Sequence, residues 1–468
     1  MHKLPESFLQ SLEGLPGYDR AAFLHAHQEG REGAAIRLNL HKTPTAHAVQ
    51  PGENRAWGEV VAARVPWCPQ AFHLTPRPAF VFDPLFHAGA YYVQEASSML
   101  LDFAWRSVCG DETDLRVLDL CAAPGGKSTL LASQENIGLL LSNEIIRNRV
   151  PSLYENVVKW GLPHMLVSSQ DPRDFQSTPG FFDAMVVDAP CSGSGLFRKD
   201  PDAVGHWSPD TVTLCSQRQQ RILADALPAL RQGGYLFYAT CSFSREEDED
   251  ICDWLVVEQG MTPVRLPVDD SWGVVESVSP KGGAYGYRCY PHRLEGEGFF
   301  LAVFRRDSGD DGTDLEATGG MQRQALAPEA MRAWVKDPGE WSWTEQAGVW
   351  LLVPAAQREA CRYLNENFRL RRSGLRVGTM AHGQFNPDHE LSMSTILAND
   401  LPSAELDLLQ SLRYLKRELP DLPSGEKGWM ILRHQGMALG LAKKLPNRIN
   451  NYYPQEWRIR ANLPEGIA

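Results

Sequence analysis

The feature that most constrains the fold is the alternation of short apolar runs with helical segments through the middle third of the chain. The runs 116–121, 139–144 and 182–188 have the length and composition of buried strands, and segments with helical spacing separate them. Alternating strands and helices joined by short connections favour a parallel sheet. We therefore predict an α/β fold built on a Rossmann-like, doubly wound sheet. Ligands bind such sheets beyond the carboxyl ends of the strands.

Two later helices carry recognisable start signals. Ser208 and Pro209 are typical of a helix cap and first turn, and the spacing of Ser244 and Glu247 predicts a capping box. A strand over 235–240 fits between these helices. The sheet therefore gains a further strand, which ends just before Cys241.

The turn after the first strand has the features of a cofactor site. It comprises Asp119, Leu120, Cys121, Ala122, Ala123, Pro124, Gly125, Gly126 and Lys127. Its glycines permit close approach of a ligand, and the following helix offers unpaired N–H groups. Glu144 ends the second strand at a separation that suits a ribose diol, and Asp171 follows the third strand, where it would bind an adenine amino group. A phosphate-binding loop needs glycine at the position of Ala122, which argues against an ATPase.

Two cysteines follow successive strands beside this turn. Cys191 lies in the segment 188–195, and Cys241 ends the next strand. A single cysteine is most often a buried apolar residue, and we assign that role to the side chain of Cys121. Two thiols at adjacent strand ends instead predict a reactive site. The helix expected from Ser244 would favour a thiolate at Cys241.

Together these motifs resemble the NOL/NOP/Sun family of RNA cytosine-5 methyltransferases. The segments that carry the resemblance are 92–99, 119–127, 188–195, 197–201 and 240–242, within a matching region of about 36–306. The resemblance implies S-adenosylmethionine as the cofactor. The residues expected to bind it are Cys121, Ala122, Ala123, Pro124, Gly125, Gly126, Lys127, Glu144, Asp171 and Asp188.

The family chemistry explains why two thiols are present. Carbon 5 of cytosine is a poor nucleophile until a thiolate adds to carbon 6. The resemblance implies that Cys241 makes this attack, that Cys191 aids release, and that Asp188 hydrogen-bonds the base. A DNA cytosine-5 methyltransferase would attack with the Pro-Cys cysteine and leave the Thr-Cys motif unexplained. A transfer RNA methyltransferase and a non-catalytic ribosome-binding factor remain alternatives.

The C-terminal third resembles the extension of the bacterial family members that modify small-subunit ribosomal RNA. Residues 428–440 read as two strands about a glycine turn, similar to the end of a PUA-like barrel. The expected parts are an N-terminal RNA-binding subdomain (1–90), the methyltransferase domain (91–306), an acidic linker (307–320), a C-terminal RNA-binding region (321–390) and a PUA-like domain (391–468). The composition of the linker predicts that the extension folds separately.

The net charge of −12 requires that RNA be bound by local basic patches. The acidic run 246–250 predicts that the catalytic domain depends on the extension for phosphate contacts. The basic candidates are Arg369, Arg371, Arg372, Arg376, Lys443, Lys444, Arg448, Arg458 and Arg460, the last five interleaved with Tyr452, Tyr453 and Trp457. Arg198 and Lys199 are either phosphate contacts or part of a solvated loop, and Arg37 is an alternative N-terminal anchor.

The remaining signals concern compartment and state. The nine cysteines are scattered without paired Cys-x-x-Cys spacing, so we expect no metal site and a reducing, cytoplasmic location. No apolar stretch reaches the roughly 18 residues of a membrane helix, and the N-terminus lacks a secretory signal. We expect a monomer whose partner is ribosomal RNA or the small ribosomal subunit.

Overall fold

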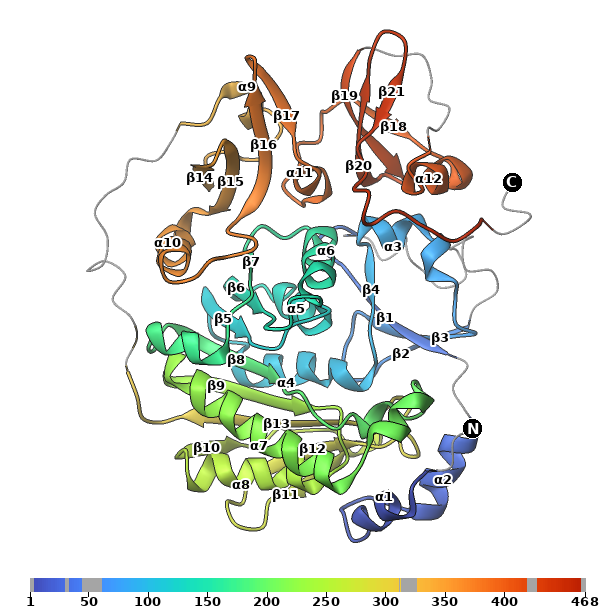
Figure 1. The fold of residues 1–468 in the computed structure, drawn as a ribbon, viewed down its shortest axis with the longest axis vertical. Coiled ribbons are helices and arrows are strands. Elements are labelled where there is room, and N and C mark those ends of the chain that lie inside the picture. Colours follow the sequence, from blue (N-terminus) through green and yellow to red (C-terminus); the bar gives the residue numbers. More distant parts are fainter. Residues whose placement is uncertain are drawn as a thin grey trace.

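The computed structural model describes residues 4–29, 33–43, 61–310, 312, 326–418 and 427–463. Most of the predicted linker, 307–320, lies outside the described residues. The described strands form one sheet of nine strands and three sheets of four (Figure 1). No described helix is both long enough and apolar enough to cross a membrane.

The nine-stranded sheet forms the core of the predicted methyltransferase domain. Its order is β11-β12-β13-β9-β8-β5-β6-β7, with β10 paired to β13. The parallel strands are β5 (Leu115–Asp119), β6 (Ile137–Asn143), β7 (Met165–Ser168), β8 (Phe182–Asp188) and β9 (Leu230–Thr240). The antiparallel strands are β10 (Met261–Val264), β11 (Val275–Val278), β12 (Tyr285–Cys289) and β13 (Phe299–Arg306). The winding reverses between β5 and β8, which places the ligand crevice at their carboxyl ends. The predicted doubly wound sheet is confirmed.

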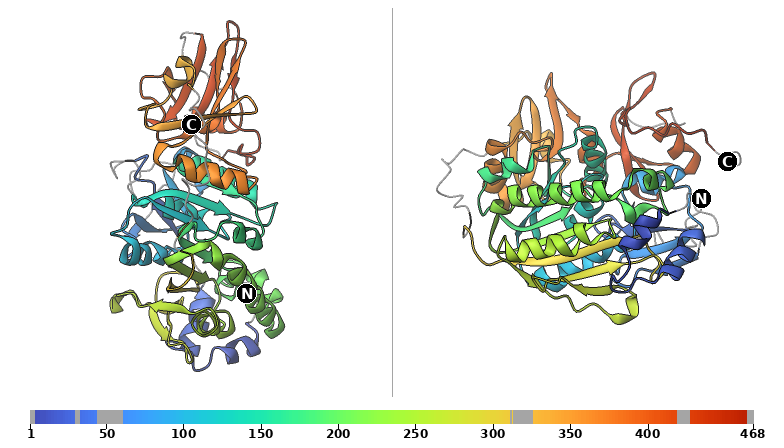
Figure 2. Two further views of the ribbon diagram at one scale, coloured as in Figure 1. Left: turned by 90° about the vertical axis from the view of Figure 1, so that its left-hand side faces the viewer. Right: turned by 60° about the horizontal axis from the view of Figure 1, so that its bottom comes forward.

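Helices cover both faces of this sheet (Figures 1 and 2). One face packs against α4 (Leu100–Cys109), α5 (Gly126–Ala132) and α6 (Val150–Trp160). The other packs against α7 (Pro209–Ala226) and α8 (Glu249–Val257). Val117 and Leu118 of β5 are buried in different hydrophobic clusters, because successive side chains of a strand point to opposite faces. The helix start at Ser208 is confirmed, since Ser208 Oγ accepts a hydrogen bond from Thr211 N at 3.1 Å.

The N-terminal residues form two small units beside the catalytic sheet. The helices α1 (Glu6–Ser11) and α2 (Arg20–Glu29) bury Phe8 and Phe23 against Phe197 and Trp207, which follow β8. A four-stranded sheet has the order β2-β3-β1-β4. Its strands are β2 (Val61–Arg64), β3 (Ala71–Thr75), β1 (Ala34–Leu38) and β4 (Tyr91–Val93), with α3 (Pro84–Ala88) between β3 and β4.

The C-terminal residues form two further sheets, visible at the top of Figure 1. The first comprises β14 (Trp341–Gln346), β15 (Val349–Pro354), β16 (Leu375–Ala381) and β17 (Gln384–Pro387), with the helices α9 (Glu329–Arg332), α10 (Arg358–Asn367) and α11 (His389–Met393). The second comprises β18 (Ser403–Glu405), β19 (Gly428–His434), β20 (Met437–Lys444) and β21 (Ile449–Asn451), with α12 (Leu408–Leu415). The predicted strand pair about a glycine turn is therefore present as the hairpin β19–β20.

Both C-terminal sheets share hydrophobic cores with the rest of the chain. Leu364 and Phe368, at α10, lie in one cluster with Phe175 and Phe182 of the catalytic part. Residues of α12 and β20 share another cluster with the N-terminal sheet, and this cluster contains both Leu439 and Ile36. Removing the chain after about residue 320 would expose these apolar surfaces to water. The packing therefore argues against the expectation that the extension folds separately.

Several residues predicted to contact RNA are structural instead. Arg372 is 2% exposed, and its Nε lies 3.1 Å from Glu390 Oε2. Arg376 forms an ion pair with Asp388, and the Tyr453 ring is buried. Arg369 and Arg371 are exposed, as the prediction requires. The sequence pattern gave no indication that Arg372 alone of these three turns inward to meet a carboxylate 18 positions later.

Replacing Arg372 with methionine should destabilise the protein by about 3–5 kcal/mol, because the Glu390 carboxylate would remain buried without its cation. The change also removes the hydrogen bond from Arg372 to the Met165 carbonyl of β7. Denaturant unfolding measures the loss. Arg369→Ala, at an exposed neighbouring arginine, is the matched control and should stay within about 0.5 kcal/mol of wild type. Equal stability of the two variants would contradict the role given to the ion pair.

Candidate active site

The predicted cofactor turn lies where the winding of the sheet reverses, between β5 and α5. Asp119 ends β5 fully buried, and its Oδ2 accepts a hydrogen bond from Ser128 Oγ at 2.6 Å. Burial raises the pKa of Asp119 to about 7, although the hydrogen bond from Ser128 opposes this shift. Gly125 has a φ of 112°, a conformation that side-chain-bearing residues rarely adopt. The turn therefore requires glycine where it enters the helix.

A cleft of about 180 Å³ opens beside this turn. It is lined by Tyr92, Val93, Gln94, Glu95, Ser98, Cys121, Ala122, Ala123, Pro124, Gly126, Lys127, Asp188 and Lys199. Lys127 Nζ lies 2.7 Å from Asp188 Oδ2, so the ion pair joins the turn to the end of β8. Most of the residues predicted to hold the cofactor thus line one cleft, which we call the cofactor-turn cleft.

Three predicted cofactor residues lie outside this lining: Gly125, which enters α5, Glu144 and Asp171. Glu144 follows β6 and is 2% exposed; its Oε1 accepts from Ile146 N at 2.8 Å and its Oε2 lies 3.2 Å from Arg149 Nη1. Asp171 caps the short helix Pro172–Ser177 and pairs with Arg173 at 3.0 Å. The Asp171 carboxylate is therefore engaged by its own segment.

The two predicted cysteines meet at the ends of neighbouring parallel strands. Cys191 follows β8 and Cys241 follows β9, and their sulfur atoms lie 3.2 Å apart. The contact with Cys241, together with burial, raises the pKa of the Cys191 thiol well above its ordinary value. Cys191 is therefore a protonated thiol at neutral pH. Such a pair can supply one sulfur for attack on an electrophile and a second sulfur that exchanges a proton.

The predicted capping box after Cys241 is wrong. Ser244 makes no side-chain cap, a short helical turn occupies Arg245–Glu247, and α8 begins only at Glu249. The reason is that the Glu247 carboxylate turns away from Ser244 and binds the cysteine loops. Cys241 accordingly lacks the adjacent α-helix N-terminus that was expected to favour its thiolate.

Glu247 joins the loops of both cysteines and was missed by the sequence reasoning. Its Oε1 accepts from Ser192 N at 2.7 Å, and its Oε2 accepts from the hydroxyls of Ser192 and Ser242, each at 2.6 Å. The side chain is fully buried, and burial raises the pKa of Glu247. Glu247 lies six positions after Cys241 in the sequence. Because it belongs to an acidic run, however, the sequence pattern predicts an exposed side chain there. Glu247 fixes Cys191 and Cys241 relative to each other.

We predict that Glu247→Gln lowers the rate constant for the reaction at the cysteines by about 10–100-fold while leaving cofactor affinity close to wild type. An amide has one acceptor oxygen, so it cannot accept from the Ser192 N–H and both hydroxyls. The measurement is kcat and KM in a methyl-transfer assay. Glu246→Gln, at the exposed preceding position, is the matched control. A rate equal to that of the control would show that the cysteines hold their positions without Glu247.

The rest of the acidic run is also largely internal. Asp248 and Glu249 are buried, and both carboxylates form ion pairs with the buried guanidinium of Arg288. Burial alone would raise the pKa of Glu249, but the neighbouring Arg288 guanidinium outweighs this effect and keeps the pKa below its usual value. These two carboxylates therefore give no support to the expectation that the acidic run makes the catalytic domain depend on the extension for phosphate contacts.

Arg37 is buried and forms hydrogen bonds with residues beside the cofactor turn. It is fully buried, with Nη2 donating to Thr129 Oγ1 at 2.7 Å and Nε donating to Gln94 Oε1 at 3.1 Å. Burial lowers the pKa of Arg37 to about 10. The interpretation of Arg37 as an RNA anchor is wrong, because its guanidinium connects β1 to α5 inside the molecule.

The doubly wound sheet, its cofactor turn and the paired thiols define a methyltransferase of the Rossmann-like class. Family models match three segments: 16S rRNA methyltransferase RsmB/F over 109–305, the N-terminal domain of 16S rRNA methyltransferase RsmF over 4–96, and the RsmF PUA domain over 402–459. Ribosomal RNA small subunit methyltransferase F of Aliivibrio fischeri is 30% identical, with 98% of each chain covered. The chain belongs to this family. The resemblance to the NOL/NOP/Sun enzymes with a PUA-like extension is thereby confirmed.

Further relatives agree with this assignment. The Klebsiella pneumoniae protein of the same name is 30% identical, covering 90% of this chain and 89% of its own length. A methyltransferase homolog from Pyrococcus horikoshii is similar in structure, with a TM-score of 0.51, 27% identity, and coverage of 65% of this chain and 100% of that chain. NSun6 from Pyrococcus horikoshii with SFG has a TM-score of 0.54 at 19% identity, covers 65% of this chain and 98% of that chain, and supports the fold.

Proposed function

We propose that this protein transfers a methyl group from S-adenosylmethionine to carbon 5 of a cytidine in small-subunit (16S) ribosomal RNA. The observation that carries this proposal is the contact of 3.2 Å between the sulfur atoms of Cys191 and Cys241 beside the cofactor-turn cleft. One thiol would suffice for a covalent attack. Cytosine-5 methylation also needs a group that promotes release, which gives the second thiol a purpose.

The residues around the cleft fit the proposed cofactor. The glycine-containing turn 121–127 offers backbone groups at the start of α5, and the buried Glu144 carboxylate at the end of β6 suits a ribose diol. Asp171 remains the proposed partner of the adenine amino group, for which it would exchange its contact with Arg173. Bound S-adenosylmethionine would supply an electrophilic methyl group at this site.

We assign the attack on carbon 6 to Cys241. The assignment follows the resemblance to the NOL/NOP/Sun family, in which the Thr-Cys position makes the attack, and Cys241 follows Thr240 at the end of β9. Addition of the Cys241 sulfur makes carbon 5 nucleophilic, so that carbon 5 takes the methyl group. A base then takes the carbon-5 proton, the double bond between carbon 5 and carbon 6 re-forms, and the Cys241 sulfur leaves as a thiolate. Cys191 lies beside that sulfur and is the group proposed to aid this release. Asp188 is the proposed hydrogen-bond partner of the base, because it lines the cleft at the end of β8.

Bisulfite sequencing of RNA from a strain that lacks this protein, beside the same strain supplied with it, tests the proposed function. Unmethylated cytidines are converted to uridine, and we expect at least one 16S cytidine to resist conversion only when the protein is present. A protein-dependent position in transfer RNA alone would favour the transfer RNA alternative. If no cytidine in any RNA depended on the protein, the non-catalytic alternative would replace the proposal.

A further inference from the structure

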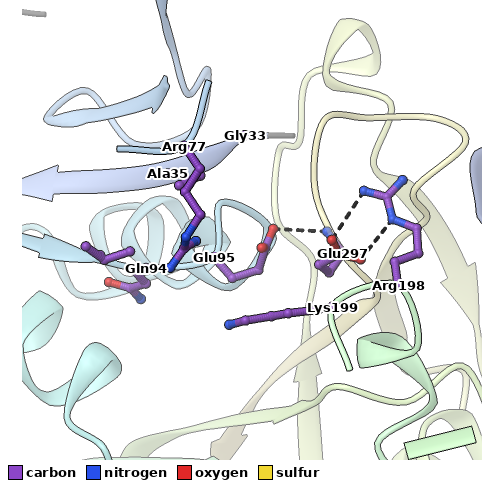
Figure 3. A pocket seen from close by; sticks show the side chains of 10 residues that line it. Gly33, Ala35, Arg77, Gln94, Glu95, Arg198, Lys199 and Glu297 are labelled. Atoms are coloured by element: carbon purple, nitrogen blue, oxygen red, sulfur yellow. Dashed lines mark hydrogen bonds and ion pairs between the residues drawn. The ribbon is translucent and has the colours of Figure 1, made fainter. Parts of the chain in front are cut away.

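A second cleft of about 380 Å³ lies between the N-terminal sheet and the methyltransferase domain (Figure 3). We call it the N-terminal cleft. It is lined by Gly33, Ala34, Ala35, Arg77, Val93, Gln94, Glu95, Arg198, Lys199 and Glu297. Val93, Gln94, Glu95 and Lys199 also line the cofactor-turn cleft. The two clefts therefore adjoin each other, and a ligand in one lies close to the reacting atoms in the other.

Part of the charge in the N-terminal cleft is already neutralised within the protein. Arg198 and Glu297 form a buried ion pair with two nitrogen–oxygen contacts of 3.1 and 3.2 Å, and their side chains are 9% and 2% exposed. Glu95 Oε1 accepts a hydrogen bond from Glu297 N at 3.0 Å, as the dashed lines of Figure 3 show. The alternative that Arg198 contacts phosphate is therefore wrong, since its guanidinium holds the wall of the cleft.

The remaining cations of the cleft are Arg77 and Lys199. Both are exposed, and Figure 3 shows their side chains extending into the space from opposite walls. Within the described part of the chain, neither forms an ion pair; Arg77 lies over the Phe80 ring at 5.4 Å. Apart from the Arg198–Glu297 ion pair, the only carboxylate among the residues that line the cleft is that of Glu95. The unneutralised charge in the cleft is thus positive, although the whole chain carries −12.

Lys199 is held at a fixed place relative to the cysteines. Its segment leads directly from Cys191, and within it Gly195 N donates to the Cys241 carbonyl at 2.8 Å while Gly195 O accepts from Gly298 N at 3.1 Å. A side chain at 195 would meet the Gly298 carbonyl oxygen at 2.5 Å and the Cys241 carbonyl oxygen at 2.7 Å, so only glycine permits this approach. The backbone of the segment that carries Lys199 is thereby fixed against the backbone of Cys241, and it follows Cys191 directly in the chain.

We infer that the N-terminal cleft binds a backbone phosphate of the RNA strand next to the target cytidine, with Arg77 and Lys199 supplying the opposing charge. This inference rests on the proposed function for the presence of an RNA strand. A phosphate suits the site because two cations face one open space, and phosphodiesters recur along a strand on either side of a reacting base. Binding there would position the strand so that the base enters the cofactor-turn cleft toward Cys241.

The test compares the full-length protein with Arg77→Ala, Lys199→Ala and the double variant. The probe is a fluorescent single-stranded RNA, whose affinity is measured at several salt concentrations. We expect the double variant to bind roughly 10-fold more weakly at low salt and the slope of log affinity against log salt to fall by about 0.7, the value for one lost phosphate contact. Lys281→Ala, at an exposed lysine that lines neither cleft, is the control and should behave as wild type.

Cofactor affinity and methylation distinguish the possible outcomes. Arg77→Ala should keep wild-type affinity for S-adenosylmethionine, because Arg77 lines only the N-terminal cleft. Its KM for RNA should rise while kcat changes little. Wild-type RNA affinity and salt slope in the double variant would overturn the inference, including the case in which the cleft holds only free inorganic phosphate. If instead wild type methylates no RNA cytidine, the proposed function fails whatever these variants do.

Discussion

Cys241→Ala is expected to abolish methylation, by at least about 10⁴-fold, while cofactor affinity stays within about 2-fold of wild type. The proposed chemistry has no route around the covalent step, because carbon 5 stays unreactive until sulfur adds to carbon 6. Cys241 is absent from the lining of the cofactor-turn cleft, so its loss should leave the cofactor contacts intact. Transfer of label from S-adenosylmethionine to RNA measures the first effect, and titration calorimetry measures the second.

A second cysteine substitution distinguishes the loss of the attacking thiol from a general loss of stability on replacing a cysteine. Cys215→Ala removes a buried thiol of α7 that is not part of the sulfur pair, and it should retain activity. Measurable turnover by Cys241→Ala, at a rate near that of the Cys215 variant, would rule out covalent attack by Cys241. Loss of cofactor binding in Cys241→Ala would show that the thiol supports the cofactor site and would remove the argument for a separate chemical role.

The residues at the strand ends of the catalytic domain could be predicted from two features of the sequence: the apolar run of each strand, and the parallel arrangement that the alternation of strands and helices implies. Apolar runs such as 182–188 define buried strands without any knowledge of their neighbours, and the residues after each run lie at one edge of a parallel sheet. This is why Cys191 and Cys241, 50 positions apart, could be placed together in advance. The turn at Gly125 was equally visible, because its conformation demands a particular residue.

Residues whose role depends on a distant partner could not be predicted in this way. Arg372 looked like its neighbour Arg371 in a basic segment, yet its partner Glu390 and the carbonyl of Met165 lie in different elements. Glu247 looked like part of a solvated acidic run, although it binds two loops that only the folded sheet brings together. Local composition predicts only the average exposure of a segment. Whether a particular polar side chain is buried depends on the specific groups that form hydrogen bonds or ion pairs with it.

The independence of the extension was misjudged for a related reason. An acidic linker suggests two separate bodies, but linker composition carries no information on the surfaces that it joins. The apolar faces of α10 and α12 are each buried in a hydrophobic cluster shared with residues outside the extension, among them Phe182 and Ile36 respectively. A helix pattern predicts that such a face is buried, but not against which element.

Cys191→Ala is expected to attack RNA but release it slowly, so that a protein–RNA adduct accumulates and survives denaturing gel electrophoresis. The Cys191 sulfur lies 3.2 Å from the Cys241 sulfur. Once the Cys241 sulfur is bonded to carbon 6, Cys191 therefore lies beside the adduct at the stage when the carbon-5 proton must leave. Alanine removes this group and leaves the addition step unchanged.

The cysteine that the adduct requires tests which sulfur attacks the base and which aids release. It should form in Cys191→Ala, be absent from the variant that lacks both thiols, and need S-adenosylmethionine to reach the methylated stage at which release fails. Multiple-turnover methylation should fall by about 10²–10⁴-fold, whereas a single-turnover burst approaching one methyl group per protein should remain. An adduct that forms in Cys241→Ala and requires Cys191 would reverse the assignment, and it would make the Pro-Cys attack of the DNA cytosine-5 enzymes the better description of this site.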